Sequence, residues 1–424
     1  MHQPFVEHRD GVLYVEDVAL PDLAERFGTP AYVYSRAALE QAWQCYDRAF
    51  GQRRHRIHYA VKANGNLAVL DCLAQLGSGF DIVSGGELAR VLAAGGDPTQ
   101  VVFSGVGKTA AEMAQALRAN LGVFNVESPS ELERLDGIAR SLGRRASIAI
   151  RVNPDVDAGT HPYISTGLNE NKFGVPMTEA LELYRHASQL PGLRVTGVAC
   201  HIGSQLTELA PFRDAMARVM ALVEQLASEG ITLEHIDAGG GLGIRYRDEV
   251  VPPVEDYVAT LCAAIPERYE ICIEPGRSIC GPAGLLLSRI EYLKTTPARH
   301  FAICDAAMTE LIRPALYEAW HDVQVVCEPA TGAPRRDYDL VGPVCESGDF
   351  LANARPLRLE PGSLVAILSA GAYGQVMASN YNARPRPPEL MVDGSEIHVA
   401  RPRERVDELF ASESRLPNAP KKND

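Results

Sequence analysis

Long apolar runs are absent from this 424-residue chain, which contains no stretch of about 18 or more consecutive apolar residues. A helix needs roughly 20 such residues to cross a bilayer, so we expect no membrane span. The N-terminal segment MHQPFVEHRDG has neither the basic region nor the apolar segment of a signal peptide. We therefore expect a cytoplasmic protein.

Basic clusters and metal-binding motifs are missing as well. The formal net charge is −13 and no run of lysines and arginines occurs. This argues against nucleic-acid or anionic-membrane partners, because both are bound largely through clustered positive charge. The nine cysteines include no CxxC pair and no spacing to histidine that suits zinc. We expect no metal site, and most cysteines should be small core residues.

Eight β-rich runs alternate with segments of helical period between residues 55 and 282. With 46% hydrophobic residues the chain can bury a large core, and this alternation is typical of βα units around a parallel sheet. Eight such units close a (β/α)8 barrel. The runs are RIHYAVKA, GFDIVS, VVFSG, GVFNVES, ASIAIRVN, VTGVACHIGS, HIDAGGGLG and YEICIEPG.

The sequence changes character after residue 282, where strands and turns replace helical segments, as in LLLSRIEYLKTT and PELMVDGSEIHVAR. This pattern predicts a second, mainly antiparallel β-domain. The run GVLYVEDV precedes the barrel, and we expect it to pair into that domain. The predicted organisation is a barrel over 30–282, a discontinuous β-domain over 1–29 and 283–410, and a disordered tail over 411–424.

Polar residues follow the apolar interior of each predicted barrel strand. In a (β/α)8 barrel the chemistry lies at the C-terminal ends of the strands, so these side chains should meet on one rim. They are Lys62, Ser84, Ser104, Glu127, Arg151, Asn153, His201, Ser204, Gly239, Gly240, Gly241, Glu274 and Arg277.

Lys62 raises a question of its own at this rim. An isolated lysine at a strand end is more often a side chain whose ammonium group reaches water. Burial at the mouth of an apolar barrel would instead depress its pKa, and a neutral amine is a nucleophile for an aldehyde. The residues predicted beside it favour the second interpretation.

Four groups expected at the rim together fit pyridoxal 5′-phosphate. Lys62 would hold the aldehyde, the turn Gly239–Gly241 would offer backbone N–H groups to the phosphate, Glu274 would keep the pyridine nitrogen protonated, and His201 would lie against the ring. A glycine triplet alone could be a tight turn, and His201 alone a satisfied core histidine. With Ser204 as a further phosphate ligand, their convergence favours a cofactor whose pyridine stabilises a carbanion at Cα.

Seven motifs carry a resemblance to the fold type III, alanine-racemase-like family of pyridoxal-phosphate-dependent decarboxylases. The resemblance spans about residues 10 to 405 and implies a homodimer whose active sites are each completed by the partner's β-domain. The motifs, in chain order, are YAVKAN, HIGSQ, GGGLG, EPGR, LIRPALY, GPVCESGDF and GAYG.

The resemblance implies a role for each matching residue. Lys62 would be the Schiff-base lysine, His201 the imidazole stacked on the cofactor, and Glu274 the partner of the pyridine nitrogen. The phosphate-binding set would be Ser204, Gly239, Gly240, Gly241, Gly276, Arg277 and Tyr373. The substrate-binding set would be Arg277, Arg313, Tyr317, Tyr373 and Glu346, with Glu346 recognising a distal ammonium group across the dimer.

Cys345 is the third residue to which the resemblance gives a catalytic role, beside Lys62 and His201. A cysteine is more often inert packing, but the setting of Cys345 in CESGDF, beside an acid and near a glycine, favours a functional reading. The resemblance implies that it donates a proton across the dimer. Residues 152–174, with His161 and Lys172, are expected to form an ordered loop near the site without a catalytic role.

The implied reaction is decarboxylation of meso-2,6-diaminopimelate to L-lysine and CO2, the last step of lysine biosynthesis. This substrate carries an amino-acid group at each end, so the site must react with one and recognise the other; two arginines suit the distal carboxylate. The alternatives are an ornithine or arginine decarboxylase of the same fold, which should lack the LIRPALY and CES pattern, a racemase, and a non-catalytic cofactor-binding protein, typically a lone barrel.

Overall fold

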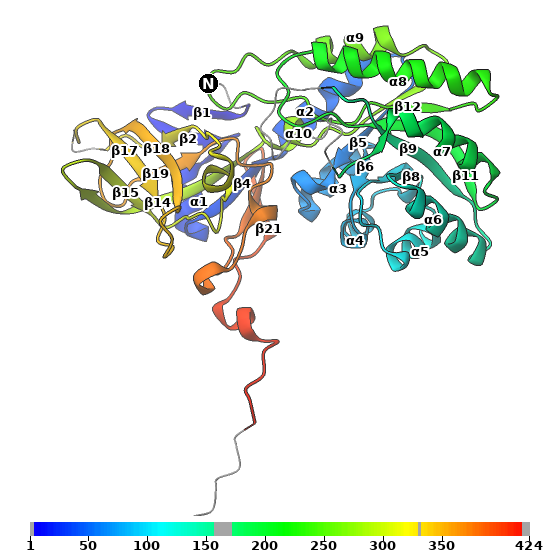
Figure 1. The fold of residues 1–424 in the computed structure, drawn as a ribbon. Coiled ribbons are helices and arrows are strands. Elements are labelled where there is room, and N and C mark those ends of the chain that lie inside the picture. Colours follow the sequence, from blue (N-terminus) through cyan, green and yellow to red (C-terminus); the bar gives the residue numbers. More distant parts are fainter. Residues whose placement is uncertain (1–3, 157–171, 330–331, 418–424) are drawn as a thin grey trace, which may run out of the picture.

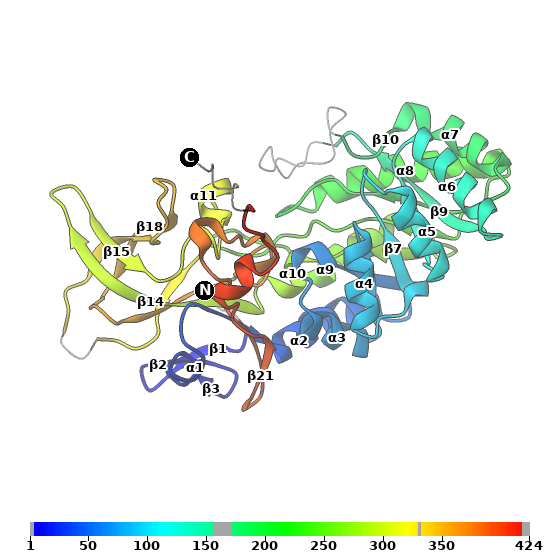
Figure 2. The same ribbon diagram turned by 90° about the horizontal axis from the view of Figure 1, so that it is seen from below.

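A computed structural model describes residues 4–156, 172–329 and 332–417. Figures 1 and 2 show a barrel of strands and helices at one end of the molecule and a second, β-rich part at the other. No helix in these described ranges is long and apolar enough to cross a membrane.

The barrel is built from eight parallel strands, and it confirms the predicted fold class. The strands pair in the order β9-β11-β12-β13-β5-β6-β7-β8, and a further pairing of β8 with β9 closes the ring. A short additional strand, β10 (Val175–Pro176), pairs with β9. The barrel strands are β5 (His55–Ala60), β6 (Gly79–Ile82), β7 (Val101–Phe103), β8 (Val123–Val126), β9 (Ala146–Asn153), β11 (Leu193–Cys200), β12 (His235–Asp237) and β13 (Glu270–Ile273).

Helices cover the outside of the barrel, as amphipathic segments between parallel strands require. Several begin at a serine or threonine whose side-chain oxygen accepts a backbone N–H of the first turn, which satisfies a donor that the helix leaves free; examples are Ser84, Thr109 and Ser128. These helices are α2 (Arg36–Phe50), α3 (Leu67–Gln75), α4 (Gly85–Ala93), α5 (Ala110–Arg118), α6 (Pro129–Ser141), α7 (Met177–Gln189), α8 (Ala210–Ser228) and α9 (Val254–Ala264), and a single-turn helix, α10 (Arg277–Cys280), follows β13.

The second sheet is mainly antiparallel, as predicted. Its order is β18-β17-β15-β14-β4-β20-β21, with β19 pairing to both β14 and β16; only β15–β17 and β4–β20 are parallel. Its strands are β4 (Ala31–Ser35), β14 (Gly284–Thr295), β15 (His300–Cys304), β16 (Val323–Val325), β17 (Arg336–Val341), β18 (Phe350–Leu357), β19 (Leu364–Ile367), β20 (Glu389–Asp393) and β21 (Glu396–Arg401), with helix α11 (Arg313–Tyr317) between β15 and β16.

The N-terminal segment differs from its prediction in one respect. The run GVLYVEDV forms β2 (Val12–Val15) and part of β3 (Val18–Ala19), which pair with β1 (Val6–Arg9) in a separate three-stranded sheet followed by α1 (Leu20–Phe27). A β-bridge between Val12 and Cys327 joins β2 to the second part of the chain, and Leu13 packs in a buried cluster with Leu285 and Val392 of that part. Instead β4, which falls inside the predicted barrel range 30–282, is the early strand that joins the second sheet. The domain boundaries themselves stay a prediction.

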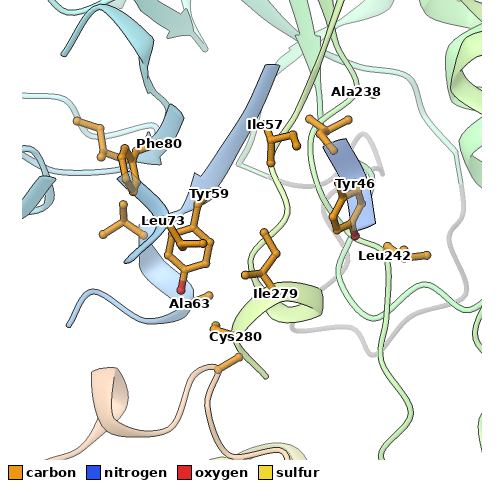
Figure 3. Close-up of a cluster of buried hydrophobic side chains, with 14 of the residues drawn as sticks. Tyr46, Ile57, Tyr59, Ala63, Leu73, Phe80, Ala238, Leu242, Ile279 and Cys280 are labelled. Atoms are coloured by element: carbon orange, nitrogen blue, oxygen red, sulfur yellow. The ribbon is translucent and has the colours of Figure 1, made fainter. Parts of the chain in front are cut away.

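One hydrophobic core runs from the barrel into the second sheet. A single cluster of buried residues includes Tyr59 and Phe80 of the barrel together with Leu286, Leu340 and other residues of the second sheet. Figure 3 shows part of this cluster, in which Tyr59 and Ala63, on either side of Lys62 in the sequence, lie near Ile279 and Cys280 of α10. The hydroxyl of Tyr59 donates to the backbone oxygen of Asn64 over 3.1 Å, so the turn that carries Lys62 rests on packed and hydrogen-bonded residues.

Two buried histidines fill the N-terminal end of the barrel. His58 of β5 stands opposite Gly79 of β6, and His235 of β12 stands opposite Gly197 of β11. A Cβ atom on either glycine would collide with the facing imidazole ring. The two glycines therefore make room for the two rings, and burial lowers the pKa of His58 to about 3 and that of His235 to about 4.

These histidines predict a loss of stability in acid. Between pH 6.5 and about 4 each imidazole is neutral in the folded chain and protonated in the unfolded chain, so unfolding takes up protons and its free energy falls as pH drops. Each should contribute a slope of about 1.4 kcal/mol per pH unit. Urea unfolding of His235→Gln between pH 5 and 6 should show a slope smaller by nearly that amount. Equal slopes for His235→Gln and the unmodified chain would contradict the assignment.

Candidate active site

Lys62 lies on a 3-10 turn, Val61–Ala63, that directly follows β5. Its Nζ is 2.6 Å from Oδ2 of Asp81, a fully buried carboxylate on β6, and 36% of the lysine side chain stays exposed. Burial alone would lower the pKa of Lys62, but Asp81 and Glu274 outweigh it and the pKa is raised. The predicted neutral amine is therefore wrong for this state of the protein: Lys62 is held as an ammonium ion.

Buried acids form the floor beside Lys62. Glu274 follows β13, and its Oε1 accepts from the side chains of Asn125 and Ser104 at 3.3 and 3.5 Å. Burial, followed by the neighbouring Asp237 and Asp81, raises the pKa of Glu274 well above its ordinary value. Burial also raises the pKa of Asp237 to about 6, although the Gly239 N–H donates to its Oδ1 over 2.9 Å. The floor thus holds more acidic groups than neighbouring cations.

His201 follows β11 and is held as a neutral imidazole. Its Nδ1 accepts the N–H of Gly240 at 3.2 Å, which leaves the ring proton on Nε2. Burial, with the charges of Arg151 and Lys62, lowers the pKa of His201 well below its ordinary value. A neutral, oriented ring at this position suits contact with another flat ring.

The turn Gly239–Gly241 differs from the prediction that its N–H groups point outward. The N–H groups of Gly239 and Gly240 are already used, by Asp237 and His201. A Cβ on any of the three glycines would collide with a backbone oxygen, that of Cys200, Glu274 or Gly203 respectively. The glycines are required mainly because neighbouring strand ends approach closely.

A cavity of about 330 Å³ opens beside His201 and brings together several predicted residues. Arg277 begins α10; its two terminal nitrogens donate to the Tyr246 hydroxyl at 2.8 Å and to Ser204 Oγ at 2.9 Å. Arg313, at the start of α11, lies with its guanidinium carbon 4.7 Å from the centre of the Tyr246 ring. The cavity is lined by His201, Ser204, Gln205, Tyr246, Glu249, Arg277, Arg313, Tyr317, Ala319, Trp320, Tyr373 and Met377.

Both arginines of the cavity are buried, with 7% of each residue exposed. Within the described ranges, neither is ion-paired to a carboxylate at 4 Å or less. Arg277 Nε, moreover, is buried without any hydrogen-bond partner there. Buried cations are normally paired, so this arrangement favours an anionic ligand.

Tyr373 connects the second part of the chain to the Lys62 turn. Its backbone N–H donates to the oxygen of Ala63 over 2.8 Å, and its ring lies 4.9 Å from the Arg277 guanidinium. Its φ of 54° is unusual for an aromatic residue, and such strain persists only where the surroundings impose it. Gly276 is close-packed as well, since a Cβ there would meet Ala60 and Ala63.

Cys345 and Glu346 do not join this cavity. Both are exposed on the connection between β17 and β18, and neither lines the pocket beside His201. The Cys345 N–H donates to Asn382 Oδ1 at 2.9 Å. Of the other cysteines, five are buried and three partly buried, and all nine are free thiols, as expected for core residues.

Four residues important to this geometry were not predicted as site residues: Asp81, Asp237, Tyr246 and His321. Asp81 and Asp237 could have been found as charged residues inside otherwise apolar strands, GFDIV and HIDAG. Tyr246 and His321 lie outside the recognised motifs and carry no such signal. The expected loop over 152–174 falls largely on residues 157–171, including His161, which lie outside the described residues.

Comparisons with known proteins identify the family of the chain. Residues 36–281 match the family described as pyridoxal-dependent decarboxylase, pyridoxal binding domain. The chain is 58% identical to diaminopimelate decarboxylase of Pseudomonas aeruginosa, over 97% of this chain and 99% of that protein. It is 44% identical to the crystal structure of diaminopimelate decarboxylase from Helicobacter pylori complexed with L-lysine, with a TM-score of 0.89 over 93% of this chain and 99% of the other.

A more distant structure shares the fold alone. Lysine/ornithine decarboxylase from Vibrio vulnificus, complexed with putrescine, is 22% identical, with a TM-score of 0.77 over 88% of this chain and 97% of the other. The matches to diaminopimelate decarboxylases cover nearly the whole chain at high identity, which assigns the chain to one group within the family. The lysine, acids and arginines at the barrel mouth are consistent with that group. The chain belongs to the pyridoxal-dependent decarboxylase family and, within it, to the diaminopimelate decarboxylases.

Proposed function

We propose that this chain decarboxylates meso-2,6-diaminopimelate to L-lysine and CO2 in the cavity beside His201. The residues that carry out the reaction would be Lys62, the acids around it and the two arginines. The observation that carries the proposal is the buried pair Arg277 and Arg313, which face the cavity without a carboxylate partner in the described ranges. A diacid can supply that partner, whereas ornithine has no second carboxylate.

The residues at the barrel mouth fit pyridoxal phosphate. The acidic floor of Asp81, Asp237 and Glu274 would accommodate a protonated pyridine, and one oxygen of Asp81 is buried without a hydrogen-bond partner among the described residues. Arg277 and Ser204, which line the cavity beside His201 and are hydrogen-bonded to each other, would hold the phosphate. When bound, the cofactor supplies an aldehyde for an amine and a pyridine ring that accepts the electrons left at Cα when CO2 departs.

Each residue of the chain has a distinct task in this proposal. Asp81 holds Lys62 Nζ at the barrel mouth and is the nearest carboxylate to take a proton from it, at 2.6 Å. Glu274 would lie against the ring nitrogen and share a proton with it, since its raised pKa makes the carboxyl a strong proton acceptor. His201, as a neutral imidazole, would lie against the ring face without adding positive charge there.

The reaction also requires a proton donor at Cα, and recognition of the far end of the substrate requires a partner for the distal ammonium. We assign these tasks to Cys345 and Glu346 of a second copy of the chain, in a homodimer with shared active sites. In favour of this, both side chains are exposed and away from their own cavity, so they are free to meet another subunit. The nine free thiols suit a reducing compartment, and we place the reaction in the cytoplasm.

The direct test is a substrate panel. The purified chain with added pyridoxal phosphate should release CO2 and L-lysine from meso-2,6-diaminopimelate, and little CO2 from ornithine or arginine. Release from ornithine at a comparable rate would favour the ornithine-type alternative, and cofactor binding without any CO2 release would favour the non-catalytic one. Racemisation without loss of CO2 would indicate the racemase.

The role of Arg313 gives a further prediction. Arg313→Lys keeps the charge but loses the paired, planar donors that match a carboxylate. We expect KM for meso-diaminopimelate to rise about 10- to 100-fold, the usual cost of hydrogen bonds to a charged group. Steady-state kinetics would measure this, and the affinity for pyridoxal phosphate should stay unchanged. Unchanged KM would remove Arg313 from the substrate site.

A further inference from the structure

His321 is a fully buried histidine between α11 and β16, with none of its surface exposed. Its ring makes two contacts: Nε2 is 2.8 Å from a terminal nitrogen of Arg313, and Nδ1 is 2.8 Å from the backbone oxygen of Leu368. Neither the family motifs nor the mechanism above uses this residue.

The two contacts determine where the ring proton lies. A backbone oxygen can only accept, so Nδ1 must carry the proton and donate to Leu368. A guanidinium can only donate, so Nε2 must accept from Arg313. Burial, with the charge of Arg313 next, lowers the pKa of His321 to about 3, which keeps the ring neutral at physiological pH.

A neutral acceptor has a specific advantage beside Arg313. A carboxylate in this position would orient the guanidinium but would also cancel its charge and occupy the donors needed for a ligand. Tyr246 supports the same arrangement, because its ring lies against Arg313 and meets the His321 ring edge-on, with centres 5.2 Å apart and planes at 77°. Arg313 is therefore oriented on one side while its charge stays available on the other.

We propose that His321 is a positioning residue for substrate recognition: as a neutral hydrogen-bond acceptor it fixes the Arg313 guanidinium for the distal carboxylate of the substrate. The inference rests on the function proposed above. It adds a residue to the specificity of the site without placing that residue in contact with substrate.

Two amide substitutions separate the two ring nitrogens. In His321→Gln the side-chain oxygen can take the place of Nε2 and still accept from Arg313. In His321→Asn the shorter amide can replace Nδ1 and donate to Leu368, but it offers no acceptor to Arg313. The two variants are matched in polarity and, by this proposal, differ mainly in the contact with Arg313.

The readout compares two competitive inhibitors. L-Lysine retains the carboxylate that stood at the distal end of the substrate, and cadaverine lacks it. We expect His321→Asn to weaken inhibition by L-lysine about tenfold and to leave cadaverine unchanged, while His321→Gln stays within about threefold of the unmodified chain for both. Equal losses for both inhibitors, or equal behaviour of the two variants, would overturn the proposal, because a merely structural histidine would affect the site as a whole.

A combined variant distinguishes this inference from the proposed function. In an Arg313→Lys background, His321→Asn should cause no further loss of L-lysine inhibition, since its effect passes through Arg313. If Arg313→Lys weakens L-lysine but His321→Asn does not, the positioning role fails and the proposed function stands. If Arg313→Lys itself leaves L-lysine inhibition unchanged, the assignment of the distal carboxylate to Arg313 fails first.

Discussion

Replacing Lys62 with alanine should reduce turnover of meso-diaminopimelate by at least about 10³-fold, because the variant loses both the covalent attachment of the cofactor and a proton-carrying group beside Cα. CO2 release under saturating pyridoxal phosphate would measure the loss. Reduction with borohydride followed by peptide mass spectrometry should find the cofactor on Lys62 of the unmodified chain and on no residue of the variant.

Lys62→Arg is the matched control, because it keeps a cation for Asp81, which is buried and would otherwise lose its ion pair. An arginine stays protonated and cannot form the covalent link, so this variant should be as inactive as Lys62→Ala while folding more like the unmodified chain. Turnover retained by Lys62→Arg would mean that the lysine acts only through its charge.

Cys345→Ala should lower kcat for meso-diaminopimelate by about 10²- to 10⁴-fold, the typical contribution of a general acid. The KM should change little, because the thiol is assigned to protonation at Cα and not to substrate binding. Pre-steady-state measurements should show CO2 released faster than L-lysine. An unchanged kcat would show that another group donates the proton.

Mixing two inactive variants tests whether Cys345 acts across a dimer. A Lys62→Ala subunit paired with a Cys345→Ala subunit would form one site with both native residues and one site with neither. After subunit exchange, half of the dimers should be mixed, so activity should return to roughly a quarter of that of the unmodified enzyme. If Cys345 served the site of its own chain, exchange would restore nothing.

The barrel and its rim could be predicted from the sequence because both follow from local patterns. Strand-like runs ended by polar residues marked each βα unit, and Lys62, His201 and Glu274 indeed meet at one end of the barrel. Periodicity also separated the barrel from the second sheet. Periodicity did not show that β4 belongs to the second sheet, because a short buried strand such as AYVYS has the same sequence pattern in a barrel and in an antiparallel sheet.

The parts of the site that were missed depend on contacts between distant segments. The charge of Lys62 was predicted wrongly because its partner Asp81 lies on the next strand, and the strand ending alone suggested desolvation without an ion pair. Tyr246 and His321 meet Arg277 and Arg313 only in the folded chain. The glycine turn was recognised, but which neighbours use its N–H groups could not be read from three consecutive glycines.

The unbroken core that joins the barrel to the second sheet bears on how the protein could be engineered. The change from helical to strand-like sequence near residue 282 suggests that the chain could be divided there, or that the C-terminal part could be replaced by that of a relative. Such a cut would leave apolar side chains such as Leu286 and Ile279 without their packing, and it would take away the tyrosine that anchors the lysine turn. Chimaeras should therefore keep a barrel and a second sheet from the same protein, because the side chains of each part pack against those of the other.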